Sequence, residues 1–128
     1  MRVLLDTHAF VWALVDPDKL AARARKVLED KDTEVVVSTA SAWEIATKYR
    51  IGKLPGAARI VGNYSAAIHG LKASELSITS AHALKAGSYT QPHRDPFDRM
   101  LVAQAEIEKL TIIGCDPALK QFGTKLLW

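Results

Sequence analysis

Three short apolar runs, separated by longer segments with helical spacing, constrain the fold of this chain more than any other feature. They cover residues 3–5, 34–38 and 110–114. Runs of this length suit buried strands better than helices, and the valines at the centre of the second run favour a strand further. Strands that alternate with helices predict an α/β fold in which helices cover both faces of a mostly parallel sheet.

Apolar residues recur at helical spacing in most of the chain between these runs. We expect helices over residues 7–14, 17–30, 41–50, 57–69, 80–85 and 96–110, and further short strands over residues 75–79 and 125–128. Asp16, Asp95 and Asp116 each precede a proline, which is typical of a helix start with Asp as N-cap and Pro in the first turn. Ser41 and Glu44 have the spacing of a capping box.

A single domain is expected, because 128 residues can bury one substantial core and no linker or low-complexity segment divides residues 1–128. The net charge of +3 is compatible with a polyanionic partner without indicating one. The lone cysteine, Cys115, excludes an internal disulfide and a multi-cysteine zinc site, and its position after an apolar run predicts a buried side chain. No signal peptide or membrane-spanning run is expected, so the predicted location is cytoplasmic.

Four acidic residues from distant segments are expected at one edge of the sheet. Asp6 follows the first run and Asp116 follows the third, while Glu44 and Asp98 lie in the first turns of predicted helices. Ligands of an open parallel sheet bind outside the carboxyl ends of its strands. Carboxylates that meet there repel one another unless they are protonated or bind a divalent cation. An all-oxygen set without Cys or His partners suits Mg²⁺ or Mn²⁺ rather than zinc.

Each acid also has a structural alternative, except one. Asp95 and Asp116 can be caps and Glu44 can belong to the capping box, whereas Asp6 interrupts the end of an apolar run without such an explanation. The spacing therefore leaves open a shared acidic metal site and a set of unrelated caps. The histidines are scattered and lack metal-ligand spacing, although His8 and His93 flank the expected site. No phosphate loop, dinucleotide fingerprint or serine-hydrolase elbow is present.

Four motifs occur in an order that resembles the PIN-domain ribonucleases, and among them the VapC-type toxins of bacterial toxin–antitoxin pairs. They are residues 4–8 (LLDTH), 41–48 (SAWEIATK), 94–105 (RDPFDRMLVAQA) and 112–116 (IIGCD), and they extend over nearly the whole chain. The resemblance implies a PIN-like α/β/α sandwich with a mostly parallel central sheet. It also implies a Mg²⁺- or Mn²⁺-dependent endoribonuclease that cleaves RNA phosphodiester bonds.

The resemblance assigns roles to particular acids. The first, second and fourth acids of the family fall on Asp6, Glu44 and Asp116, and the third falls on Asp98, which precedes the helical motif in the family's register. Asp95 is an additional acid, expected to act as a cap first and as a catalytic helper second. Asp6 and Asp98 are expected to hold the metal, with Glu44 and Asp116 completing its surroundings directly or through water.

Substrate contacts and partners also follow from the resemblance. Arg94 and Arg99 are expected to steer phosphates, although Arg99 can instead pair with Asp95, and Thr7 and His8 are further candidates for substrate contact. Gly114 stands where the family often has Thr or Ser, which leaves Thr7 as the nearby hydroxyl. The expected partners are the RNA substrate, a small cognate antitoxin that masks the acidic pocket, and a second copy in a homodimer, with no membrane.

Two other classes of protein fit parts of the pattern. A noncatalytic binding module would use the acids only as helix caps. A phosphoryl-accepting receiver or phosphatase domain shares the sheet and the acidic edge, but it usually carries a pair of aspartates after the first strand, and residues 6–8 (DTH) lack that pair. Calorimetry with Mn²⁺ separates the binding module from a metal-dependent enzyme.

Overall fold

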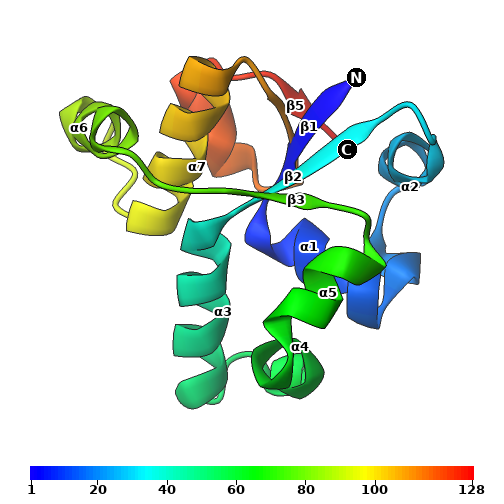
Figure 1. The fold of residues 1–128 in the computed structure, drawn as a ribbon. Helices are drawn as coiled ribbons and strands as arrows, with labels where there is room; N and C mark the ends of the chain where they lie inside the picture. The colour runs from blue at the N-terminus through cyan, green and yellow to red at the C-terminus, as the bar shows by residue number, and fades with distance from the viewer.

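β1 (Arg2–Leu5) is the central strand of a five-stranded sheet in the computed structural model, which describes residues 1–128. Its neighbours are β2 (Glu34–Ser38) and β4 (Thr111–Ile113), and β3 (Ser74–Leu76) and β5 (Leu126–Leu127) form the edges. All pairings are parallel, so the carboxyl ends of the strands share one edge of the sheet (Figure 1). The strands predicted from the apolar runs are confirmed.

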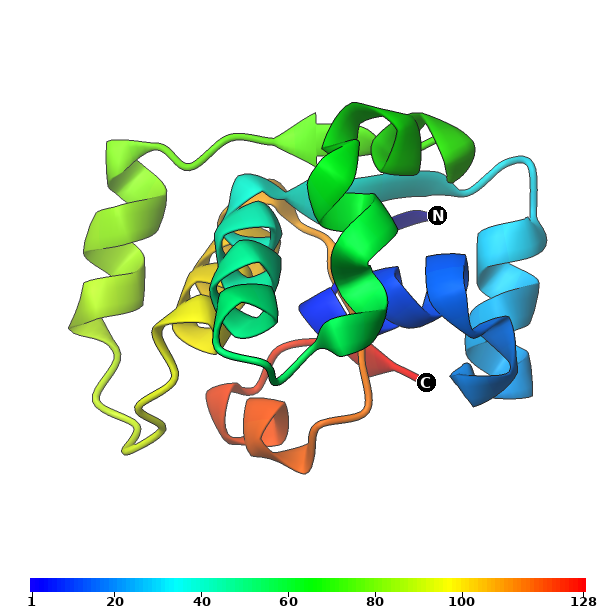
Figure 2. The same cartoon turned by 90° about the horizontal axis from the view of Figure 1, so that it is seen from below.

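Helices cover both faces because consecutive strand residues, whose side chains point to opposite faces of the sheet, are apolar. Val3 and Leu5 join a core formed with α1 (Thr7–Val15), α2 (Ala22–Glu29), α4 (Ala58–Gly62) and α5 (Tyr64–Gly70). Leu4 joins a second core on the other face, formed with α7 (Pro96–Glu108) and the 3-10 helix η3 (Pro117–Phe122). α6 (Ser80–Ser88) lies outside α7, and α3 (Thr39–Arg50) continues from β2 (Figure 2). The predicted α/β/α sandwich on a parallel central sheet is confirmed.

The predicted capping box at Ser41 and Glu44 is wrong. α3 begins at Thr39, two residues earlier than expected, because the hydroxyl of Ser38 accepts a hydrogen bond from the Ala40 N–H at 3.0 Å. Ser41 and Glu44 therefore lie inside the helix, and both are buried. The capping alternative for Glu44 is removed by this shift in the start of the helix.

Two other helix predictions need correction. Asp16 makes no capping bond through its side chain, because it ends α1 with a bond from its own N–H to the Trp12 carbonyl. Pro17 then begins a short 3-10 turn, η1 (Pro17–Lys19), and α2 starts only at Ala22. The helix expected over residues 57–69 is divided into α4 and α5 by Asn63, whose side chain caps α5. The 3-10 turn η2 (Pro55–Ala57) precedes α4.

Cys115 is exposed, which contradicts the prediction of a buried side chain. β4 ends at Ile113, so Cys115 already lies in the turn beyond the covered part of the sheet. None of the helices has both the length and the hydropathy needed to cross a membrane.

Candidate active site

Three aspartates begin helices at the carboxyl edge of the sheet. Oδ1 of Asp6 accepts a hydrogen bond from the Ala9 N–H at 2.7 Å and caps α1. Asp95 accepts bonds from two backbone N–H groups of α7, at 2.9 and 3.3 Å, and Asp116 accepts one from η3 at 2.9 Å. The predicted caps at Asp95 and Asp116 are confirmed, and Asp6 is a third. Capping holds each carboxylate in a defined place.

The acids at this edge of the sheet raise the pKa of Asp6. Asp6 is only 6% exposed and forms no ion pair. Burial raises the pKa of its carboxyl group to about 7, the Ala9 N–H opposes this, and the charges of Asp98, Glu44 and Asp116 raise the pKa further. Those charges act on Asp6 because the four side chains lie near one another. Capping and convergence of the acids are therefore compatible.

Glu44 is held by groups that sequence reasoning did not assign to it. Its Oε1 accepts a hydrogen bond from the Thr7 hydroxyl at 2.5 Å, and its Oε2 contacts the Lys48 ammonium one turn later in α3. Burial lowers the pKa of Lys48, but Glu44 together with the charges of Asp95 and Asp98 more than offsets this, so the pKa lies above its ordinary value. The spacing of four residues between Glu44 and Lys48 was the available signal for this pair.

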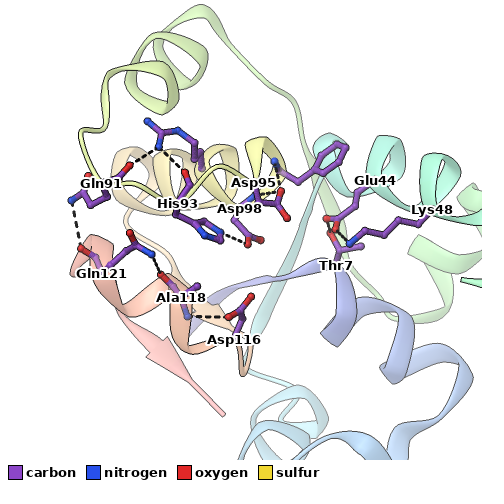
Figure 3. A network of polar contacts seen from close by, with 12 residues as sticks. Thr7, Glu44, Lys48, Gln91, His93, Asp95, Asp98, Asp116, Ala118 and Gln121 are labelled. Atoms are coloured by element: carbon purple, nitrogen blue, oxygen red, sulfur yellow. Dashed lines mark hydrogen bonds and ion pairs between the residues drawn. The ribbon is translucent and has the colours of Figure 1, made fainter. Parts of the chain in front are cut away.

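Asp98 lies in the first turn of α7 and faces the other acids. Figure 3 shows it beside Asp95, with the His93 ring against it. Nε2 of His93 lies 2.8 Å from Oδ2 of Asp98, while Oδ1 makes no hydrogen bond to the protein. Burial raises the pKa of Asp98, the contact with His93 lowers it, and Asp95 and Glu44 raise it again.

The residues predicted to touch substrate occupy different environments. The Thr7 side chain is buried against Glu44, and His8 is exposed with its ring 5.7 Å from that of Trp12. Arg94 is exposed on the segment before α7. Arg99 does not pair with Asp95, so that alternative is wrong. Its guanidinium instead donates hydrogen bonds to four backbone carbonyls.

The donor set fits a hard divalent cation in its chemistry. Asp6, Asp98 and Asp116 each use one carboxylate oxygen in a bond to the protein and leave the other without a protein partner. The buried charge of Asp6 also lacks a neutralising cation, a deficit that a bound metal would remove. No group of three or more His, Cys, Asp or Glu side chains is arranged to hold a metal ion in this structure, so the carboxylates would have to move closer together to bind one.

The sequence matches the PIN domain family over residues 3–125. The chain belongs to the PIN domain family. This PIN domain is 49% identical over 41 residues to Ribonuclease VapC16 of Mycobacterium tuberculosis (strain ATCC 25618 / H37Rv), in an alignment that covers 29% of this chain and 29% of that relative. The expected family is confirmed.

A solved structure extends the likeness of this PIN domain to the whole fold. It is the crystal structure of VapBC2 from Rickettsia felis bound to a DNA fragment from their promoter. The TM-score is 0.68 over 99% of this chain and 98% of that chain, at 12% sequence identity. At this identity the likeness concerns the fold alone.

Gly114 has a steric role in this PIN domain at the position where the resemblance led us to expect Thr or Ser. A Cβ atom on residue 114 would lie 2.8 Å from Cγ of Asp6 and closer still to Oδ2. The Asp6 carboxylate thus occupies the space of the missing side chain. The packing of Asp6 therefore explains why residue 114 is Gly rather than Thr or Ser.

Replacing Gly114 by Ala is expected to lower the free energy of unfolding by about 1–3 kcal/mol and to weaken Mn²⁺ binding, because the added methyl group must displace the Asp6 carboxylate. Thermal unfolding and calorimetry measure the two effects. Gly62→Ala is the control, since nothing lies within 4 Å of a Cβ at that exposed position of α4. Wild-type stability and Mn²⁺ affinity in Gly114→Ala would contradict the steric role.

Proposed function

We propose that this PIN domain is a Mg²⁺- or Mn²⁺-dependent endoribonuclease and the toxin of a toxin–antitoxin pair. The observation that carries the proposal is Asp6, a buried carboxylate without a cationic partner, surrounded by Glu44, Asp98 and Asp116 at the carboxyl edge of the sheet. The ribonuclease name of the VapC16 relative supports the activity, and the resemblance to VapC-type toxins supports the biological role.

The proposed ligands of the cation are Asp6 and Asp98, which each present a carboxylate oxygen with no protein partner. Asp116 lies at the exposed rim and completes the site directly or through water. Both oxygens of Glu44 already contact Thr7 and Lys48, so Glu44 acts by holding negative charge at a fixed place beside the ligands. Asp95 caps α7 and supplies a further charge next to Asp98.

A bound Mg²⁺ or Mn²⁺ would supply a nucleophile at neutral pH and offset the negative charge that develops on the phosphate. The acidic side chains alone repel RNA, so the attraction must come from basic groups outside them. Arg94 is exposed next to Asp95 and is our candidate for a phosphate contact. Arg99 is a poorer candidate for this role, because its guanidinium already donates to four backbone carbonyls.

The proposed partners are RNA, a small antitoxin that covers the acidic pocket, and a second copy of this chain. The whole-fold likeness to a chain of VapBC2 makes an antitoxin complex a reasonable target for experiment. Co-purification with the product of a neighbouring short reading frame tests the antitoxin, and sedimentation of the purified protein tests the homodimer.

RNA cleavage by the purified protein tests the activity. We expect cleavage of single-stranded RNA with Mn²⁺, loss of cleavage with EDTA, and recovery after Mn²⁺ is restored. Asp32→Asn is the matched control, because Asp32 is exposed before β2, at the opposite edge of the sheet, and its side chain makes no hydrogen bond or ion pair. Equal cleavage with and without EDTA would contradict the metal-dependent mechanism.

Asp98→Asn is expected to weaken Mn²⁺ binding more than Asp95→Asn does. Both carboxylates keep one oxygen without a protein partner, but the charge of Asp98 acts on the other proposed ligand, Asp6, and that of Asp95 is not among the charges that do. We expect a loss of about tenfold or more for Asp98→Asn, in line with the removal of one charged ligand. Calorimetry measures both affinities, and a larger loss for Asp95→Asn would reverse the two roles.

A further inference from the structure

Arg99 ties the segment between α6 and α7 to the start of α7. Its Nε donates to the Ala86 carbonyl at 3.1 Å, and its Nη1 donates to the carbonyls of Gln91 and His93 at 3.1 and 2.9 Å. Nη2 donates to the Tyr89 carbonyl. All four acceptors are uncharged, so the planar guanidinium acts here as a rigid set of donors rather than as one half of an ion pair.

The segment held by Arg99 has few other means of keeping its shape. Residues 89–94 belong to no helix or strand, and no hydrogen bond between backbone groups involves them. Beyond Arg99, Nε2 of Gln91 donates to the Gln121 carbonyl at 3.5 Å, and the rings of Tyr89 and His93 rest against Phe122, with centroids 5.1 and 6.0 Å away. Every hydrogen bond to the backbone of this segment therefore comes from the side chain of Arg99.

His93 lies at the end of this segment and connects it to the acidic site. Its own carbonyl is one of the four that Arg99 binds, and its Nε2 lies 2.8 Å from Oδ2 of Asp98 (Figure 3). This bond fixes the rotation of the Asp98 carboxylate and leaves Oδ1 without a protein partner. A side chain that orients a metal-binding group in this way commonly affects metal affinity by tenfold or more.

We propose that Arg99 and His93 are positioning residues that orient Asp98 for the cation, Arg99 by holding the 89–94 backbone and His93 by contacting Oδ2. The inference rests on the proposed function, because it concerns the same site. It assigns Arg99 a structural connection to the metal-binding group instead of a contact with RNA.

Mn²⁺ titration by calorimetry tests the contribution of His93. His93→Leu is expected to weaken Mn²⁺ binding by about tenfold or more. His93→Gln is expected to restore most of the affinity, because the Gln amide nitrogen can take the place of Nε2. Equal affinities for the wild type and His93→Leu, or no rescue by Gln, would overturn the role of His93.

Arg99→Lys tests the connection through the backbone. A lysine keeps the charge but cannot reach four carbonyls in one plane, so we expect a loss of Mn²⁺ affinity similar to that of His93→Leu. Arg59→Lys, at an exposed arginine of α4 without side-chain hydrogen bonds, is the matched control. Wild-type affinity in folded Arg99→Lys would overturn the role of Arg99.

A measurement without metal separates positioning from general destabilisation. Proton–nitrogen NMR spectra of the metal-free protein report whether the His93 imidazole keeps its bond to Asp98. We expect Arg99→Lys to change the His93 signals and Arg59→Lys to leave them as in the wild type. Unchanged His93 signals in Arg99→Lys would contradict the connection.

The outcomes distinguish this inference from the proposed function. If the wild type binds Mn²⁺ and Asp6→Asn does not, while His93→Leu and Arg99→Lys bind as the wild type does, only the positioning roles fail. If the wild type does not bind Mn²⁺, the proposed function fails, and the positioning roles fail with it even where the NMR contact is seen.

Discussion

Replacing Asp6 by Asn is expected to reduce RNA cleavage by about a thousandfold or more while the fold is retained. The change removes a proposed ligand of the cation, whose contribution to phosphodiester hydrolysis is typically several kcal/mol, and about 1.4 kcal/mol corresponds to a tenfold change in rate. The fold should survive because the Asn side-chain oxygen can still accept the Ala9 N–H bond that starts α1.

Single-turnover cleavage of one RNA by matched amounts of protein measures this effect, with circular dichroism as the check of folding. Asp32→Asn serves again as the control, since it removes the same charge at the opposite edge of the sheet. Full Mn²⁺-dependent activity in Asp6→Asn would contradict the mechanism. An unfolded variant would contradict the assignment of Asp6 to chemistry rather than to stability.

Raising the pH from about 4 to about 7 is expected to destabilise the metal-free protein through the same residue. The pKa of Asp6 is about 7 in the folded chain and 3.8 as its ordinary value. Between these values the folded state binds a proton that the unfolded state has released, so the free energy of unfolding falls as pH rises. The difference of about three pKa units corresponds to an upper value on the order of 4 kcal/mol.

Urea unfolding of the wild type and Asp6→Asn across this range isolates the contribution of one carboxyl group. The two proteins should be similarly stable near pH 4, and Asp6→Asn should be the more stable one near pH 8, where Asp6 carries its buried charge. Added Mn²⁺ should stabilise the wild type near pH 8 and have less effect on the variant. A constant difference between the two proteins at all pH values would contradict the raised pKa.

The sequence predicts most of the fold because the signals for strands are local. The three apolar runs became β1, β2 and β4, and the Asp-Pro pair at residues 95–96 begins α7 as expected. The start of α3 was harder to predict because Ser38 and Ser41 both suit an N-cap. The choice between them depends on the tertiary structure, in which Ser41 is buried against Thr7.

The sequence was enough to predict which acids belong to the site, but not how deeply they are buried or which groups contact them. Sequence position suggested that Asp6 and Asp98 approach the same edge, whereas burial determines the raised pKa of each. Arg99 shows the limit most clearly. An arginine beside two aspartates suggests an ion pair or a phosphate contact, and only the path of residues 89–94 reveals that its partners are carbonyl groups.

The parallel pairing of β1 with β4 has a consequence for the synthesis of the protein. Asp6 and Asp116 are 110 residues apart in the sequence, and they share an edge only after β4 has been added beside β1. A growing chain that has emerged as far as α7 contains Asp6, Glu44 and Asp98 but not Asp116. The acidic site is therefore complete only after nearly the whole chain has been synthesised.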